Sequence, residues 1–235
     1  TDATKAYEFT VNLGSATNTD DADGEVITTS SHRPSDAEIV QGLQGFLGEI
    51  MQVPPQFSAV KINGQRAYKL ARAGEEIEIA ARSLLVEELI LADRPTLDTA
   101  VLEMTCGKGG YVRAIARDLG EKLGCYGHVA NLRRIWSGPF DLEHAVTLEQ
   151  IEQFAKTSDI DQFLRPLEVG LTDLPQGTTN AEGAAKLRNG NPAICFTKAE
   201  YGDEIWVSHE GKAQAIGRYK SGQIHPTRVL LQTKH

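Results

Sequence analysis

The 235-residue sequence has few cysteines and no long apolar run. Its three cysteines (Cys106, Cys125 and Cys195) lie far apart and form no C-x-x-C motif, which argues against a zinc knuckle and against a disulfide scaffold. No apolar run reaches the ~18–20 residues that a membrane helix needs, and no signal-peptide pattern is visible. These absences predict a reduced, cytoplasmic protein without a membrane segment.

The sequence also lacks the common metal and nucleotide motifs. Its six histidines show no H-x-x-x-H or H-E-x-x-H spacing, so no metal site is predicted. Gly107-Lys108-Gly109-Gly110 fails the Walker pattern, and Ser58 lacks a nucleophile-elbow context. Two interpretations of the glycine loop stay open: its N–H groups and Lys108 suit an RNA phosphate, and the same residues suit a tight turn.

Charge is present but uneven. The chain has 24 Lys+Arg against 32 Asp+Glu, a formal charge of −8, which argues against a nonspecific nucleic-acid binder. Residues 105–140, however, carry six basic and two acidic side chains, or +4. A local basic face that binds nucleic acid is one interpretation of this window, and a solvated charged surface is the other.

Apolar periodicity predicts an α+β domain. Alternating apolar residues predict strands at 7–13, 57–62, 76–79, 84–91 and 100–105, and helical spacing predicts helices at 35–47, 67–73 and 111–123. Local signals support these elements: a capping box at Ser35–Glu38, a hairpin at Asn63-Gly64, and terminating glycines at 74 and 124.

The composition changes after Arg165-Pro166. Thr147 is expected to cap a helix to Phe154, and Asn180 a short helix over 181–188. Short strands separated by Gly and Pro follow at 193–196, 204–208, 213–219 and 228–232. This pattern predicts a small β-rich module after a boundary near residues 166–176.

Two clusters carry candidate chemistry. Asp20, Asp21 and Asp23 do not fit the EF-hand pattern, so they predict a solvated acidic turn. In Tyr111-Val112-Arg113, the ring can stack on a base and the guanidinium can hold a carboxylate. A core tyrosine and a surface ion pair are the ordinary alternative, which spacing alone favours.

Several ordered motifs over residues 5–150 resemble one family. Val53-Pro54-Pro55-Gln56-Phe57-Ser58-Ala59-Val60-Lys61, followed by Gly64, Tyr68 and Ala71-Arg72, resembles the central block of the TruB family of tRNA pseudouridine synthases. Residues 106–113, followed by Asp118-Leu119-Gly120, resemble the family's C-S-K-G-T-Y-I-R block. The stretch from Gly124-Cys125 to Phe140 resembles the next block of the family, and residues 20–24 resemble its acidic turn. Asn189-Gly190-Asn191-Pro192 and Arg228-Val229-Leu230 resemble the PUA-type module of bacterial members.

The resemblance implies isomerisation of uridine to pseudouridine in the T loop of tRNA, position 55, without a cofactor. A base flipped out of its stack must meet a carboxylate, an aromatic ring and a proton acceptor. By resemblance, Tyr7 stacks on the base and is a candidate proton acceptor, and Arg113 pairs with the catalytic aspartate. Tyr111 and Leu132 line the uracil site, and Lys61 and Lys108 contact RNA or the pocket.

One departure from the family concerns that aspartate. Its G-H-x-G-T-L-D block does not occur in this sequence, which therefore resembles an N-terminally truncated member. We expect no isomerase activity from this polypeptide alone, in which Arg113 would lack its anionic partner, the catalytic aspartate. Glycines at 107 and 110, where the family often has Ser and Thr, affect only local loop rigidity.

The overall prediction is an α+β catalytic domain at residues 1–166, with a mixed, mainly antiparallel sheet and flanking helices. A small β-rich, PUA-like RNA-binding module is expected at 167–235. The expected partner is the T arm of tRNA, and a monomer is expected. A noncatalytic tRNA-binding or RNA-folding protein that uses the same cleft is the alternative, and a synthase of a sister branch acting on another RNA is a third option.

Overall fold

A computed structural model describes residues 3–62, 64–75 and 77–230 of the chain. The chain divides into two compact units, Thr1–Leu142 (unit 1) and Glu143–His235 (unit 2). Each unit contains one six-stranded sheet. The α+β class with mainly antiparallel sheets and a C-terminal β-rich module is thereby confirmed. The division at residues 166/167 stays a prediction.

The sheet of unit 1 is antiparallel throughout. Its spatial order is β10 (Phe140–Asp141), β9 (Gly127–Ser137), β1 (Lys5–Leu13), β8 (Thr99–Cys106), β7 (Arg82–Thr96) and β4 (Gly48–Gln52). Strand β1 alternates buried and more exposed side chains, as a strand with one face on a core requires. In register, Phe9 pairs with Leu102 of β8 and with Leu132 of β9, so these three side chains share one face.

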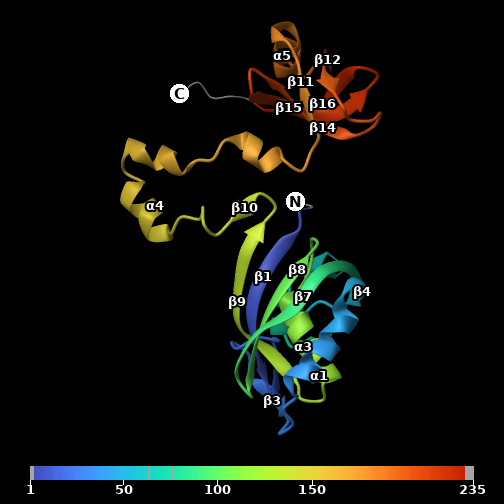
Figure 1. The fold of residues 1–235 in the computed structure, drawn as a ribbon, viewed down its shortest axis with the longest axis vertical. Helices are drawn as coiled ribbons and strands as arrows, with labels where there is room; N and C mark the ends of the chain where they lie inside the picture. The colour runs from blue at the N-terminus through green and yellow to red at the C-terminus, as the bar shows by residue number, and fades with distance from the viewer. Residues whose placement is uncertain (1–2, 63, 76, 231–235) are drawn as a thin grey trace. The chain divides into compact units, whose positions relative to one another are not determined.

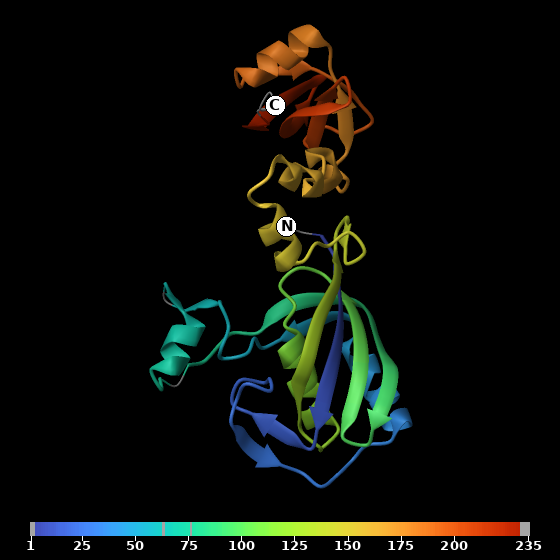
Figure 2. The same cartoon turned by 90° about the vertical axis from the view of Figure 1, so that its left-hand side faces the viewer.

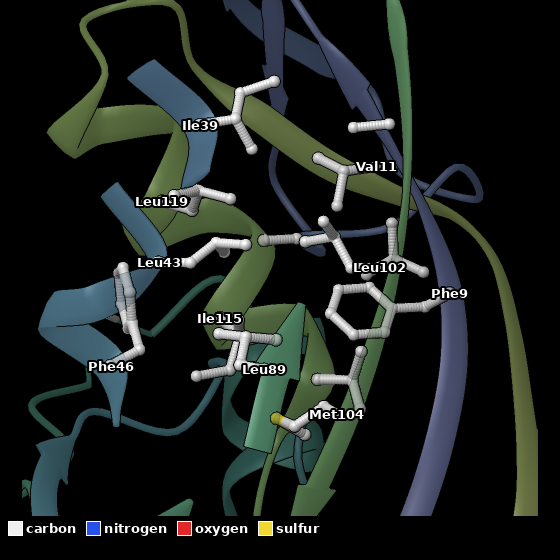
Figure 3. Packing of buried hydrophobic residues seen from close by; sticks show 14 of the residues in the cluster. Phe9, Val11, Ile39, Leu43, Phe46, Leu89, Leu102, Met104, Ile115 and Leu119 are labelled. Carbon is white, nitrogen blue, oxygen red and sulfur yellow. The ribbon is translucent and has the colours of Figure 1, made fainter. Parts of the chain in front are cut away.

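Helices α1 (Asp36–Leu43) and α3 (Val112–Lys122) cover one face of this sheet (Figure 1). The predicted capping box starts α1: the Ser35 hydroxyl accepts from the Glu38 N–H, and the Glu38 carboxylate accepts from the Ser35 N–H. The 3-10 turn η1 (Gln44–Phe46) continues α1. Figure 3 shows Phe9, Leu102 and Met104 pointing from the strands toward both helices.

The core between sheet and helices is almost completely closed to solvent. Its helix side is formed by Ile39 and Leu43 of α1 and by Ile115 and Leu119 of α3, each at most 1% exposed. Burial of a side chain of this size contributes about 1.5–3 kcal/mol. This packing fixes α3 on the sheet, and α3 carries the candidate site.

A separate segment, residues 56–80, extends from the body of unit 1 (Figure 2, cyan). It contains β5 (Lys61–Ile62) paired with β6 (Gln65–Arg66), then helix α2 (Ala67–Arg72). A small apolar cluster of Val60, Ala67 and Ile79 holds it together. We call residues 56–80 the arm. A second hairpin, β2 (Ser15–Thr17) with β3 (Val26–Thr29), carries the acidic turn between its strands.

Unit 2 begins with helical turns and ends in its sheet. The helical part comprises α4 (Leu148–Phe154), η2 (Ser158–Phe163) and η3 (Leu167–Leu171). The sheet has the order β12 (Ala193–Ile194), β16 (Gln223–Val229), β15 (Lys212–Lys220), β14 (Glu204–His209), β11 (Gln176–Thr178) and β13 (Phe196–Thr197). Helix α5 (Ala181–Arg188) starts at the predicted Asn180 cap, and Leu171 packs on Trp206 of the sheet.

Several expectations from periodicity were wrong. Only Lys61–Ile62 of the predicted strand 57–62 is a strand. Residues 57–60 form a loop of the arm after Pro54-Pro55, which cannot donate backbone hydrogen bonds to a sheet. Residues 77–79 form no strand, and β16 begins at Gln223 rather than at 228. The periodicity also missed β4 and β9. Asn63, Glu76 and residues 231–232, the end of the predicted strand 228–232, lie outside the described residues.

Candidate active site at the start of helix α3

The candidate site is built on two arginines one helical turn apart. Helix α3 follows the glycine loop, and its N-cap, Tyr111, has extended backbone angles (φ −108°, ψ 103°). Arg113 and Arg117 are at i and i+4, so both leave the helix on one side. That side faces the acidic turn and the loop that precedes the arm.

Arg113 holds three chain segments together. Its Nη1 donates to the Thr19 carbonyl (3.0 Å) and to Oδ2 of Asp21 (2.9 Å). Its Nη2 donates to the Phe57 carbonyl (2.8 Å). The side chains of Arg113 and Asp21 are only 24% and 27% exposed, so their ion pair is partly shielded from water.

Arg117 repeats this arrangement one turn later. It donates to Oδ2 of Asp20 (3.1 Å), to Oδ1 of Asp118 (2.8 Å) and to the Val53 carbonyl (2.9 Å). Burial raises the pKa of the Asp20 carboxyl despite the opposing charge of Arg117. For Arg117, burial opposes the charged form, but the hydrogen bond and the charges of Asp118 and Asp20 outweigh it and raise its pKa.

The acidic turn is solvated only in part: Asp20 and Asp21 are partly buried against the protein, whereas Asp23 is exposed, so the expectation of a solvated turn was wrong for Asp20 and Asp21. The Asp20 side chain is 14% exposed. The Val129 N–H donates to the Asp20 carbonyl (3.0 Å), and the Ala22 N–H donates to the Val129 carbonyl (2.9 Å). Arg113 is paired with a different acid, because the turn's contacts with β9 place Asp21 beside it.

Arg113 and Leu132 line one open pocket of about 240 Å³. Its remaining lining residues come from the acidic turn and from β9: Asp21, Ala22, Asp23, Val129, Ala130 and Asn131. Leu132 is 49% exposed although it lies on the same sheet face as Phe9. The pocket thus combines a cation, carboxylates and an exposed apolar wall.

Tyr7 of β1 is not among the pocket-lining residues, but it neighbours one of them. It pairs in register with Arg134, two residues from Leu132, so Tyr7 and Leu132 are diagonal neighbours on one sheet face. The ring is half-buried against the core. Burial and the nearby Cys106 raise the pKa of the phenol, and Arg134 opposes this shift. The phenol is therefore neutral at physiological pH.

The other predicted site residues lie outside the pocket lining. Tyr111 packs against the apolar cluster of the arm, Lys61 is exposed on β5, and Lys108 is exposed in the glycine loop. Among residues 3–62, 64–75 and 77–230, no cluster of His, Cys, Asp or Glu side chains is placed to hold a metal ion. Within the same residues, no helix is long and apolar enough to cross a membrane.

Sequence reasoning missed Asp20, Asp21 and Arg117 as members of the site. Two signals were present: adjacent acids in one short turn, and arginines at i and i+4 on one helix. Neither signal says that the turn and the helix meet, because 92 residues separate Asp21 from Arg113. The pairing of the turn with β9 brings them together.

Comparisons with known proteins point to one family. Residues 1–112 match the TruB family pseudouridylate synthase N-terminal domain, and residues 113–172 match the tRNA pseudouridylate synthase B C-terminal domain. The tRNA pseudouridine synthase B of Ruegeria sp. (strain TM1040) is 66% identical over 99% of this chain and 77% of that protein. The synthase B of Agrobacterium fabrum (strain C58) is 42% identical over 97% of this chain and 76% of that protein.

Solved structures agree in fold. A chain of a Cbf5-Nop10-Gar1 complex matches with a TM-score of 0.70 at 18% identity, over 98% of this chain and 66% of that one. A chain of an H/ACA RNP bound to a substrate RNA also matches with a TM-score of 0.70, at 16% identity, over 98% of this chain and 67% of that one. The sequence matches, with this shared fold, show that the chain belongs to the TruB family of pseudouridine synthases.

Proposed function

We propose that the protein isomerises uridine to pseudouridine in the T loop of tRNA, at position 55. The observation that carries this proposal is the pocket that joins Arg113 to Leu132, in a chain 66% identical to a protein named tRNA pseudouridine synthase B. Its volume of about 240 Å³ equals that of roughly eight molecules of liquid water, enough for one pyrimidine ring. A base inside a helical stack cannot reach it, so the target uridine must flip out.

The reaction requires breaking the C1′–N1 bond, rotating the uracil, joining C5 to C1′, moving the C5 proton to solvent and placing one proton from solvent on N1. Substrate and product are isomers, so no cofactor is required. Leu132 offers an apolar wall to the uracil ring, and Tyr7 an aromatic ring as its stacking partner. Tyr7 is also the candidate proton acceptor, a role that requires its phenolate form, which the raised pKa disfavours. Tyr111, Lys61 and Lys108 contact the pocket or the RNA from the arm and the glycine loop.

Arg113 orients the carboxylate that attacks the sugar or the base. A guanidinium has five N–H donors, and three are engaged with Thr19, Asp21 and Phe57. The two remaining donors suit a second carboxylate. We propose that this is the aspartate of a G-H-x-G-T-L-D block, which is not among these 235 residues.

The proposal includes a division at residues 166/167, with RNA binding by the C-terminal module, a monomeric state and a cytoplasmic location. The three cysteines are free and buried, as in proteins of reducing compartments. RNA affinity should fall with salt concentration, because Lys61 and Lys108 would neutralise phosphates. Substitution of either lysine by Gln should make the negative slope of log K against log salt shallower by about one.

The test is isomerisation of a T-arm hairpin labelled with 5-tritiated uridine. The N-terminal segment of the Ruegeria relative, joined to residues 1–235, should give tritium release from the uridine at position 55 only. Arg113→Lys should slow single-turnover release about 100-fold, because a planar two-pronged contact is lost. The matched control is Arg82→Lys, at an exposed position of β7.

Two results would contradict the proposal. Equal release from uridines elsewhere in the hairpin would remove the assigned specificity. Tight T-arm binding without release by the joined protein would favour the noncatalytic alternative, which the relatives' names do not favour.

A further inference from the structure

Gln52 is a buried polar residue next to the candidate site, and it has no role in the reaction steps described above. It is the last residue of the edge strand β4 and is only 3% exposed. Its side-chain amide forms two hydrogen bonds with the backbone of Tyr111: Oε1 accepts from the Tyr111 N–H (2.9 Å), and Nε2 donates to the Tyr111 carbonyl (3.1 Å). One side chain thus makes the pair of bonds that a neighbouring strand would make.

The residue held in this way directly precedes helix α3. Tyr111 is the N-cap, and no side chain of its own caps the helix. Its carbonyl also accepts the first helical bonds, from Ala114 (3.1 Å) and Ile115 (3.2 Å). Because the two bonds fix the peptide groups before and after Tyr111, Gln52 sets the direction in which α3 begins.

Two site residues depend on that direction. Arg113 follows two residues after the cap, and the Tyr111 ring packs against the apolar cluster of the arm. The chain after Gln52 also accepts from the α3 arginines, at the Val53 and Phe57 carbonyls. Replacing Gln52 alters the support of the α3 start without altering either arginine.

We propose that Gln52 is a positioning residue: its amide holds the start of α3 so that Arg113 lines the base pocket and Tyr111 packs against the arm, while Gln52 contacts no RNA itself. This inference rests on the proposed function, since it assumes that the pocket takes a uridine. Its burial and its two hydrogen bonds to the backbone exclude Gln52 from direct contact with substrate.

The experiment compares two T-arm hairpins, one with uridine and one with an abasic site at position 55. Affinities of the 235-residue chain are measured by fluorescence anisotropy, and amide exchange at Tyr111 by NMR. Gln52→Leu removes both hydrogen bonds, and Gln52→Glu keeps the acceptor but not the donor. Gln41→Leu, at an exposed position of α1, is the matched control.

We expect the wild type to prefer the uridine hairpin and Gln52→Leu to reduce this preference about 10-fold, with abasic binding unchanged within about 2-fold. Gln52→Glu should retain slow exchange at Tyr111 with an intermediate preference. If Gln52→Leu does not fold, the Gln52→Glu comparison decides the question.

Three outcomes would overturn the inference. If both Gln52 variants keep the wild-type preference for the uridine hairpin, this inference is overturned and the proposed function stands. An equal loss of affinity for both hairpins has the same consequence, because it indicates a merely structural role for Gln52. A wild type that binds both hairpins equally overturns the proposed function, and this inference with it.

Discussion

Substituting Asp21 by Asn tests whether the acidic turn stabilises unit 1 through Arg113. Asn keeps an oxygen that can accept from the Asp23 N–H, as Oδ1 of Asp21 does, but loses the charge opposite the guanidinium. Exposed ion pairs contribute about 0–1 kcal/mol, and removal of one partner from a buried pair costs about 3–5 kcal/mol. With both side chains about one quarter exposed, we expect a loss of about 1–2 kcal/mol.

The assay is a double-mutant cycle with Arg113→Gln, measured by urea unfolding followed through tryptophan fluorescence. Trp136 lies in unit 1 and Trp206 in unit 2, so the probe covers both units. We expect a coupling energy of about 1–2 kcal/mol.

The matched control is Asp23→Asn in the same turn. Because the Asp23 side chain is exposed, this substitution should change the free energy of unfolding by less than about 0.5 kcal/mol. A coupling below about 0.3 kcal/mol, or an equal loss in the control, would refute the assigned ion pair.

Three further outcomes are expected. Gly120→Ala should lower the free energy of unfolding by about 2–3 kcal/mol, because the new Cβ would lie 2.2 Å from a backbone nitrogen of β9. Gly45→Ala is the control in the same denaturation assay: its Cβ would meet only the movable end of Lys122, and the loss should be under about 1 kcal/mol. Burial raises the pKa of Cys106 to about 11, and all three cysteines are buried, so a thiol reagent at pH 8 should label less than one cysteine before denaturation and three after it. Burial raises the pKa of Tyr7 above its ordinary 10.0 in the folded state, so the contribution of Tyr7 to folding stability is complete below pH 10 and declines as pH rises through the folded-state pKa. Tyr7→Phe should remove that decline and should also remove one phenolate transition above pH 10 in the absorbance at 295 nm. Loss of a transition below pH 10 instead would contradict the assignment.

Local signals predicted the elements whose causes are local. The Ser35 box, the Asn180 cap and the apolar stripe of α3 each produced the expected helix, and the alternation from Tyr7 to Leu13 produced β1. Strand β9 was missed because its middle residues, Asn131 to Arg134, are exposed at the sheet edge and show no alternation of burial. The pattern at 77–79 misled because those residues bury Ile77 and Ile79 in the arm without sheet pairing.

The sequence by itself determined the class of the fold, the helix that carries Arg113 and, through ordered motifs, the family, because caps, periodicity and motif spacing are written along the chain. Only the tertiary structure decided what Arg113 meets. Its partners Thr19, Asp21 and Phe57 lie 94, 92 and 56 residues away, and they converge because β9 holds the acidic turn while core packing holds α3 against the sheet. Contacts of this separation depend on the packing of the whole unit, which no local pattern records.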